Sequence, residues 1–448
     1  MRESRYNIWA DKPDGAYVFN ARSGALLHID DDDRQALRRF LKDQTPGCSP
    51  KVLASMAAGS MLIPDDTDEL AVLATRYAAS RNNTSRFALT VVTSLGCNFN
   101  CPYCFEDKHP SVMDDDVQAL VLECLDDQLP RIGGFHVTWF GGEPLVGIKS
   151  LLALSDAFIE RCNAGGVGYD ADIITNGYLL DAAICAKLAA RKVTSVQIGL
   201  DGPPDIHDRM RPLVNGKGSF NTIVSNLHHA VEHFSVSVRV NIDLGNFDRV
   251  EELFQQLEAE GFGGKLSIYP GQIVGAKDNP AAPSAAYRGC FANREFAHAS
   301  QSFIRTAAQY GLAGPGLPTP TGAPCTAVRA NELVVGSHGE LYKCWNSVGN
   351  TREVVGHIRD YKQLNSRLTK WLSYDPFAND ECRSCIALPV CMGGCAQHAF
   401  DKLQYENRCG TFRHTYREQI DEFIDFAEAR GLQGLTPVAH LARRMETR

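Results

Sequence analysis

The sequence lacks any run of about 20 apolar residues, the length that a helix needs to cross a bilayer. Its first residues, MRESRYNIWADKPD, also lack the apolar core of a secretory signal. Positive charge is scarce, because 45 Lys and Arg residues face 53 Asp and Glu residues and the net charge is −8. This balance argues against a general nucleic-acid binder, which needs concentrated positive charge to neutralise phosphates. We therefore expect a cytoplasmic protein that binds neither membranes nor nucleic acid.

What the sequence holds in excess is cysteine. The chain has 448 residues, of which 44% are hydrophobic and 22% are charged, a mix typical of an ordered protein with two or three domains. It contains 15 cysteines. Because a reducing cytosol disfavours structural disulfides, cysteines in such a protein more often bind metal or take part in catalysis.

Residues 1–80 are predicted to form the first unit. Three short strands, YNIWAD, AYVFNA and ALLHID, are separated by the turn-forming pieces KPDG and RSG, which favours a β-meander. Helical patterns follow these strands. The polar segment SRNNTS carries no hydrophobic periodicity and therefore indicates a domain boundary.

Residues 87–311 alternate between strand-like and helical patterns. Repeated βα units of this kind predict an α/β fold with a parallel sheet or barrel, whose chemistry lies at the carboxyl ends of the strands. Six units are too few for a closed eight-stranded barrel, so we expect a partial (β/α)6 barrel. The predicted strands are FALTVVTSL, FHVTWFGGE, ADIITNG, SVQIGLDG, VSVRVNID and KLSIYPGQ.

The remainder of the chain is organised differently. A Gly- and Pro-rich break at 311–324 is followed by weak periodicity and a high density of cysteine. This pattern predicts a loop-rich, metal-held domain over residues 312–415. Residues 416–448 are expected to form a helical tail.

The first cysteine cluster lies on the loop after the first barrel strand. Cys97, Cys101 and Cys104 have the spacing C-x3-C-x2-C. Cubane iron–sulfur clusters take four thiolates, so three close cysteines suggest a cluster with one iron left open for another ligand. The alternative is a structural zinc knuckle, for which His109 is the candidate fourth ligand.

This cluster and the stretch at the end of the second strand resemble the radical S-adenosylmethionine (SAM) enzymes. The resemblance implies that the second stretch holds the methionyl amino group of SAM, where glycines let the backbone approach the ligand closely. The matching residues are Cys97, Cys101, Tyr103, Cys104, Gly141, Gly142, Glu143 and Pro144.

Four more residues are candidates for the SAM site. Asn176 and Asp201 follow the third and fourth strands, but both precede Gly, so turn formation is an equal alternative to a SAM contact. By the same resemblance, Arg211 is expected to meet the SAM carboxylate. Arg239 belongs to a polar face of the fifth strand and either binds a ligand or forms a core ion pair. One departure stands out, because many relatives have Ser where this chain has Gly199.

The second constellation resembles the seven-cysteine SPASM domain, which in relatives carries two auxiliary [4Fe-4S] clusters. The resemblance implies that Cys325, Cys344 and Cys395 hold the first of these clusters, with Cys290 as a candidate fourth ligand. The second cluster is then held by Cys382, Cys385, Cys391 and Cys409. A four-cysteine zinc site is the alternative, since the spacings Cys382-x2-Cys385 and Cys391-x3-Cys395 also fit zinc. Cys124, Cys162 and Cys185 lie on apolar faces of predicted helices and are expected only to pack.

The resemblance implies SAM and three [4Fe-4S] clusters as cofactors, and a 5′-deoxyadenosyl radical that removes hydrogen from a substrate carbon. Residues 1–80 resemble the winged-helix-like elements that capture leader peptides. We therefore expect a maturase that crosslinks a ribosomal precursor peptide, through a thioether or a carbon–carbon bond, with electrons from a flavodoxin or ferredoxin. The alternatives are an anaerobic sulfatase-maturating enzyme that makes formylglycine, and a non-catalytic iron–sulfur redox sensor or zinc scaffold.

Overall fold

The computed structural model describes residues 1–43, 47–275 and 279–430. Its N-terminal unit contains the predicted meander as a three-stranded antiparallel sheet in the order β2-β3-β4. A further short pair, β1 with β5, closes the unit. The elements of this unit are β1 (Arg2–Glu3), β2 (Asn7–Lys12), β3 (Gly15–Asn20), β4 (Ala25–Ile29), α1 (Asp31–Asp43), α2 (Pro50–Ala58), β5 (Leu62–Ile63) and α3 (Glu69–Arg81).

The meander buries both of its faces, because apolar residues occupy both sides of its strands. Val18 and Ile29 pack in a small core with residues of α1 and α2. Ile8, Phe19 and Leu26 belong instead to the main hydrophobic core of the molecule. The N-terminal unit is therefore packed against the rest of the chain through apolar contacts as well as through the backbone.

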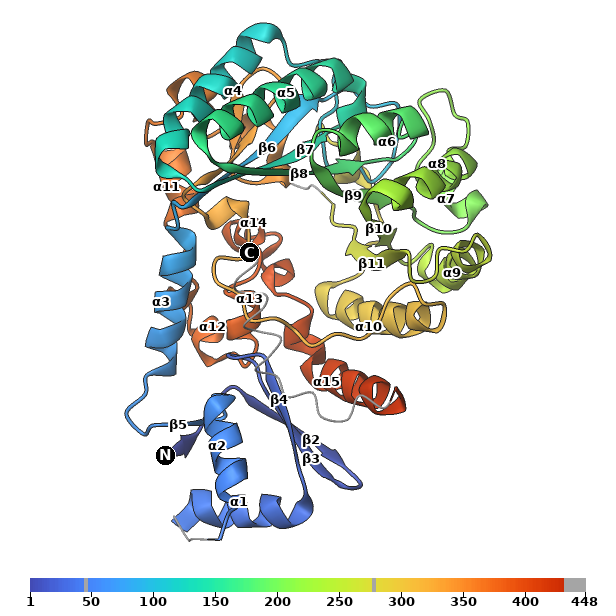
Figure 1. Cartoon of the computed structure of the whole chain (residues 1–448). Coiled ribbons are helices and arrows are strands. Elements are labelled where there is room, and N and C mark those ends of the chain that lie inside the picture. Colours follow the sequence, from blue (N-terminus) through green and yellow to red (C-terminus); the bar gives the residue numbers. More distant parts are fainter. Residues whose placement is uncertain (44–46, 276–278, 431–448) are drawn as a thin grey trace.

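The barrel comprises six parallel strands in the order β11-β10-β9-β8-β7-β6, as the sequence predicts. Helices cover its outer face, and Figure 1 shows α4 and α5 lying over β6, β7 and β8. The strands are β6 (Arg86–Ser94), β7 (Gly134–Gly141), β8 (Gly168–Thr175), β9 (Val193–Gly199), β10 (Ser235–Ile242) and β11 (Leu266–Gln272). The helices are α4 (Asp115–Gln128), α5 (Ile148–Gly165), α6 (Ala182–Ala189), α7 (Pro204–Met210), α8 (Phe220–His233), α9 (Val250–Ala259) and α10 (Asn293–Gln309).

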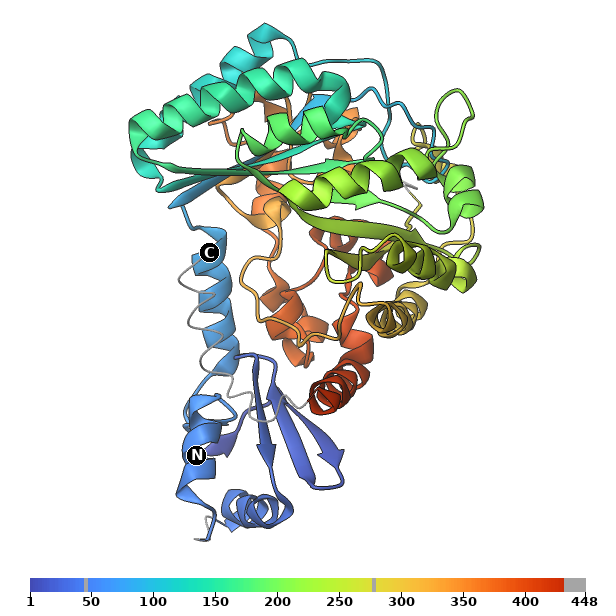
Figure 2. The ribbon, with the colours of Figure 1, turned by 45° about the vertical axis from the view of Figure 1, so that its right-hand side comes forward.

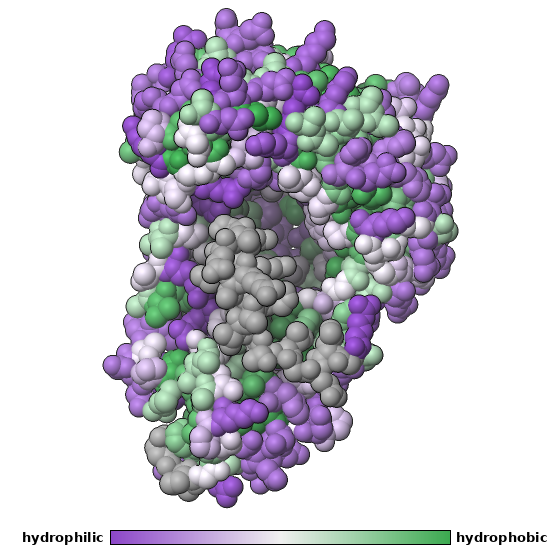
Figure 3. All heavy atoms as spheres, in the orientation of Figure 1, coloured by the Kyte–Doolittle hydropathy of each residue, from purple (hydrophilic) through white to green (hydrophobic). Residues whose placement is uncertain are grey.

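Burial alternates along these strands with a period of two. On β7, Phe135, Val137 and Trp139 are fully buried in the main core, whereas His136 and Thr138 between them are partly exposed. The outer helices present mostly hydrophilic residues at the top of the molecule, and the surface is hollowed beneath them (Figure 3). Cys124, Cys162 and Cys185 are fully buried in the core on α4, α5 and α6, which confirms the prediction that they pack as small hydrophobes.

The cysteine-rich region extends the barrel sheet, which the sequence did not predict. β12 pairs in parallel with β6, and β13 and β14 then continue the sheet in antiparallel fashion, so that it has nine strands in all. The elements of this region are β12 (Glu332–Val335), β13 (Glu340–Tyr342), β14 (Gly356–His357), α11 (Ser366–Leu372), α12 (Asp380–Ser384), α13 (Leu388–Cys391), α14 (Ala396–Phe400) and α15 (Phe412–Ala429).

The last described helix, α15, connects distant parts of the molecule. It packs against α10 and against β2 of the N-terminal unit. Figures 1 and 2 both show it between the barrel side and the N-terminal sheet. The predicted tail over residues 416–448 is described only as far as residue 430, and the rest of it lies outside the described residues. None of the described helices has the length and apolar character needed to span a membrane.

Candidate active site

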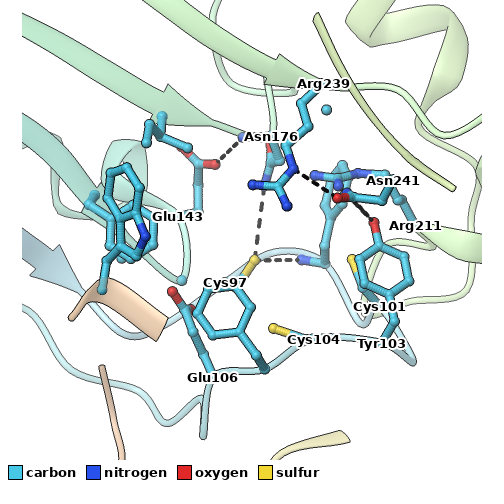
Figure 4. Close-up of a pocket in the computed structure, with 18 of the residues that line it drawn as sticks. Cys97, Cys101, Tyr103, Cys104, Glu106, Glu143, Asn176, Arg211, Arg239 and Asn241 are labelled. Carbon is cyan, nitrogen blue, oxygen red and sulfur yellow. Dashed lines mark hydrogen bonds between the residues drawn. The ribbon is translucent and has the colours of Figure 1, made fainter. Parts of the chain in front are cut away.

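A pocket that is open to solvent lies at the carboxyl ends of the barrel strands. The predicted cysteines Cys97, Cys101 and Cys104 all line it, on the loop that follows β6. Figure 4 shows this loop below the ends of the strands, with the side chains of Asn176, Arg211 and Arg239 around it. The structure thus brings together most of the residues that the resemblance assigns to the SAM site. Those that line the pocket are Cys97, Cys101, Tyr103, Cys104, Gly141, Gly142, Glu143, Asn176, Arg211 and Arg239.

The three thiols lie in a buried environment. Burial raises the pKa of the Cys97 thiol to about 11 and that of the Cys104 thiol to about 12. They bind as thiolates only if a cation stabilises the negative charge, as the irons of a cluster do. In the described part of the chain, no three His, Cys, Asp or Glu side chains are placed to share one metal ion. A cubane cluster, by contrast, binds each thiolate through a different iron.

Glu143 holds the ends of two strands together. Its carboxylate is fully buried and accepts hydrogen bonds from the Thr175 hydroxyl at 2.7 Å and from the Asn176 and Leu145 amides at 2.7 and 3.0 Å. Gly142 beside it lies so close to the cysteine loop that a Cβ there would come within 2.5 Å of the Leu95 carbonyl oxygen. Glu143 therefore fixes the backbone that lines the pocket.

Asn176 has one of the two roles that the sequence left open, turn formation, and it also contacts the cysteine loop. Its Oδ1 accepts a hydrogen bond from the Tyr178 amide at 3.0 Å, which is turn chemistry. Its Nδ2 donates to Oδ1 of Asn98, on the cysteine loop, at 2.7 Å. The side chain thus ties the end of β8 to the loop that carries Cys97.

Asp201 does not line the pocket itself but supports residues that do. Its buried carboxylate accepts hydrogen bonds from the Tyr103 hydroxyl and, at 2.9 Å, from the Asn241 amide. Arg211 donates from Nη1 to the Tyr103 hydroxyl at 2.9 Å, and the same nitrogen lies 3.7 Å from Oδ2 of Asp201. Asp201 therefore orients Tyr103 and Arg211 at the pocket wall.

The absence of a side chain at Gly199 leaves room for Arg211. A Cβ at this position would come within 2.6 Å of Nη1 of Arg211 and 2.9 Å of Nη2. A serine there would therefore displace the guanidinium, which gives the departure from the common pattern a physical reason. Nε of Arg211 is buried and has no hydrogen-bond partner among the described residues, so it can donate a hydrogen bond to a ligand.

Arg239 lies at the same end of the pocket as Arg211 (Figure 4). It donates from Nε to Oδ1 of Asn241 at 2.9 Å, and Gly271 on β11 provides the space that its side chain occupies. Asn241 also contacts Asp201, so the two arginines belong to one hydrogen-bonded group. Two guanidinium groups at one end of a pocket suit a carboxylate ligand.

We expect the change Gly199→Ala to weaken SAM binding by about 10- to 100-fold, because hydrogen bonds to charged groups contribute roughly 1.5–3 kcal/mol each. Equilibrium binding to anaerobically purified protein measures the effect. The control is Gly133→Ala, where the nearest atom to a new Cβ, the Ser85 carbonyl oxygen, is 3.9 Å away. If Gly199→Ala bound SAM as tightly as the control, Arg211 would not be a SAM ligand.

Sequence reasoning missed several residues that line the pocket, among them Glu106, Lys108 and Trp345. Glu106 is only 3% exposed, and burial raises the pKa of its carboxyl to about 7. Lys108 donates to the Phe99 carbonyl oxygen at 2.8 Å. Trp345, which is 44% exposed, packs with its ring centroid 5.9 Å from that of Phe140. Only Trp345 had a signal in the sequence, since it directly follows a motif cysteine.

The remaining motif cysteines form two groups in the C-terminal region. In the first, nearby charge on Cys395 and Cys325 adds to burial in raising the pKa of the Cys344 thiol. In the second, burial and three neighbouring thiols raise the pKa of Cys391 to about 12. These three neighbours are Cys382, Cys385 and Cys409. The resemblance implies the same two sets as cluster ligands, and this assignment stays a prediction.

Cys290, the candidate fourth ligand of the first group, lies next to the barrel pocket. It packs with Tyr287 against a cluster that contains Ile206, Met210 and Ile273. Tyr103 packs against the same cluster and lines the pocket. This position adds no support for a role of Cys290 beside Cys325, Cys344 and Cys395.

Residues 91–257 match the family model described as the radical SAM superfamily. The chain is therefore an enzyme with a radical SAM domain, and radical SAM domains use SAM and a [4Fe-4S] cluster. It is homologous to the serine-type anaerobic sulfatase-maturating enzyme of Klebsiella pneumoniae, with 25% identity over 369 residues, which cover 76% of this chain and 88% of the relative.

Two solved structures share the fold. One is native anSMEcpe with bound AdoMet and Cp18Cys peptide, which is 17% identical, has a TM-score of 0.57 and covers 75% of this chain and 99% of its own. The other is Streptococcus suis SuiB bound to precursor peptide SuiA, which is 13% identical, has a TM-score of 0.53 and covers 92% of this chain and 99% of its own. The fold is therefore the α/β radical SAM fold with a mixed sheet.

Proposed function

We propose that this enzyme crosslinks a ribosomally made precursor peptide by hydrogen abstraction and oxidation. The observation that carries the proposal is the N-terminal unit. SuiB, whose structure contains a precursor peptide, covers 92% of this chain, whereas anSMEcpe covers 75%. The difference corresponds to a segment about as long as residues 1–80. The structure of SuiB, which contains a precursor peptide, matches more of this chain than anSMEcpe does, and this supports a precursor peptide as the substrate here.

In this proposal the barrel pocket binds SAM. When bound, the cluster and SAM supply a 5′-deoxyadenosyl radical. Cys97, Cys101 and Cys104 hold the cluster, and the backbone at 141–144, fixed by Glu143, holds the amino group of SAM. Arg211 and Arg239 at the other end take its carboxylate. Arg211 is oriented by its hydrogen bond to the Tyr103 hydroxyl and its ion pair with Asp201, and Arg239 by its hydrogen bond to Oδ1 of Asn241.

The leader of the precursor is proposed to bind at the edge of the N-terminal sheet. Of the two edge strands, β2 lies beside α15, where Lys12 pairs with Asp421 and Asp425. The other edge strand is β4, which pairs only with β3 among the described strands. An extended peptide can add to such an edge through backbone hydrogen bonds. Residues 1–80 then act as a leader-recognition domain.

Residues 312–415 are proposed to be a SPASM-type domain with two auxiliary clusters, beside a barrel domain at 87–311. Joining two substrate groups after one hydrogen abstraction releases one proton and one electron. The two auxiliary clusters offer an acceptor for this electron. Either a thioether or a carbon–carbon bond satisfies the balance, and an external flavodoxin or ferredoxin supplies the electron that starts each cycle.

Coexpression with each short peptide encoded beside the gene tests the proposal. We expect the peptide to lose two hydrogen atoms for each crosslink, which high-resolution mass spectrometry and fragmentation detect. A peptide without its leader half should be modified at least about 10-fold less, because the leader contributes most of the binding. Unmodified peptides in every case, from an enzyme that cleaves SAM, would contradict the proposal.

A second candidate is an anaerobic sulfatase-maturating enzyme. It is favoured by the match to the Klebsiella pneumoniae enzyme over 88% of that protein. The two candidates differ in product, since a sulfatase maturase converts a single Ser or Cys to formylglycine and leaves no crosslink. A sulfatase-derived peptide modified by this enzyme would establish the second candidate.

A further inference from the structure

Tyr6 is a buried residue of the N-terminal unit with an unusual hydroxyl. The side chain is 0% exposed, and its hydroxyl has no hydrogen-bond partner among the described residues. Leaving such a group unpaired destabilises the fold, and in native proteins it calls for a specific explanation such as an ion. An acceptor that binds next to this hydroxyl would satisfy it.

The second cysteine group lies next to this part of the N-terminal unit. Arg5 donates from Nη2 to the carbonyl oxygen of Arg383 at 2.8 Å, and Arg383 lies on α12 between Cys382 and Cys385. Burial raises the pKa of Tyr6 to about 12, and negative charge on Cys385 adds to this increase. Figures 1 and 2 both show α12 adjoining the N-terminal sheet. The segment that carries Tyr6 is therefore docked on the segment between Cys382 and Cys385.

Cationic donors also surround this group. Arg413 of α15 donates from Nη1 to Sγ of Cys409 at 3.0 Å. Arg408 is only 4% exposed, and its buried Nε has no partner among the described residues. Glu381 pairs with both arginines. Two buried donor atoms, the Tyr6 hydroxyl and Nε of Arg408, thus lack an acceptor among the described residues. A cluster held by the four cysteines would supply acceptors through its sulfurs.

We infer that the N-terminal unit contributes the Tyr6 hydroxyl as a hydrogen-bond donor to the auxiliary cluster held by Cys382, Cys385, Cys391 and Cys409, and that this bond raises the reduction potential of that cluster. The inference rests on the proposed function, which supplies the cluster. Hydrogen bonds to cluster sulfurs stabilise the more negative, reduced state. The same unit that we propose binds the leader therefore also adjusts an electron acceptor.

The test is a redox titration of anaerobically reconstituted Tyr6→Phe enzyme, followed by electron paramagnetic resonance. We expect the midpoint of one auxiliary cluster to fall, so that its reduced-to-oxidised ratio at fixed potential drops by up to about 10-fold, or about 59 mV for one electron. The signal of the cluster at Cys97 should not move. The matched control is Tyr17→Phe, which removes another tyrosine hydroxyl of the N-terminal unit, one that donates to Glu428 at 2.9 Å.

A second variant, Arg413→Gln, should lower the midpoint of the same cluster. Loss of auxiliary iron in Tyr6→Phe but not in Tyr17→Phe would also support the contact. Unchanged midpoints in Tyr6→Phe with full iron content, or an equal shift in Tyr17→Phe, would overturn the inference alone. Wild-type enzyme that binds only enough iron for one cluster would overturn the auxiliary clusters as well, so the iron count separates the two failures.

Discussion

Replacing Cys97, Cys101 and Cys104 together with Ala should abolish reductive cleavage of SAM. These thiols are the only cysteines among the described residues that line the barrel pocket. Changes outside the ligands of a metal already cost roughly 10- to 100-fold, so the loss of all three ligands should exceed about 100-fold. Release of 5′-deoxyadenosine by anaerobic, reduced protein measures this. Iron bound by the C-terminal region should remain, because its cysteines form separate groups.

The matched control removes a cysteine that only packs. Cys185 is fully buried on α6, and its Sγ lies 3.7 Å from the Leu180 carbonyl oxygen. Cys185→Ala should keep wild-type SAM cleavage with a modest loss of stability, since the change leaves a small cavity. Triple-variant protein that still produced 5′-deoxyadenosine would remove these cysteines from the mechanism.

The barrel was predictable because hydrophobic and polar residues alternate along its strands, and this alternation reflects which side chains are buried. On β7, the alternation of Phe135, Val137 and Trp139 with more polar residues follows directly from side chains that point to opposite faces. β12 carries no comparable signal. It has only four residues, and its partner β6 lies at the far end of the barrel sequence. A short strand whose partner is distant is specified by tertiary pairing and not by local pattern.

In the candidate site, too, local sequence patterns were predictable and long-range contacts were not. The cysteines were found because ligand spacing is a local property of the loop. The support that Asp201 gives to Tyr103, and the space that Gly199 leaves for Arg211, depend on which strand ends meet. Tyr6 lies even further from the motifs in sequence, and its place beside α12 follows from the docking of the N-terminal unit. Such contacts need the fold before they can be argued.

Replacing Cys409 with Ala should have the largest effect on stability. Cys409 belongs to the four-cysteine group, and its Sγ accepts the hydrogen bond from Arg413 that joins this group to α15. Because cluster binding and local folding are coupled, total iron should fall by about a third if one of three clusters is lost. The segment around Cys382–Cys391 should then become sensitive to limited proteolysis.

Cys48→Ala provides the control, since Cys48 is a buried thiol of the small N-terminal core and belongs to neither group. The Cys48→Ala variant should contain as much iron as the wild-type enzyme. The position of α15 makes a further consequence testable, because this helix packs against both α10 and β2. If the second cluster holds α15 in place, Cys409→Ala should also speed amide exchange in β2, where Lys12 pairs with Asp425. Full iron content with unchanged exchange would mean that Cys409 binds no cluster and that α15 is held by its apolar contacts alone.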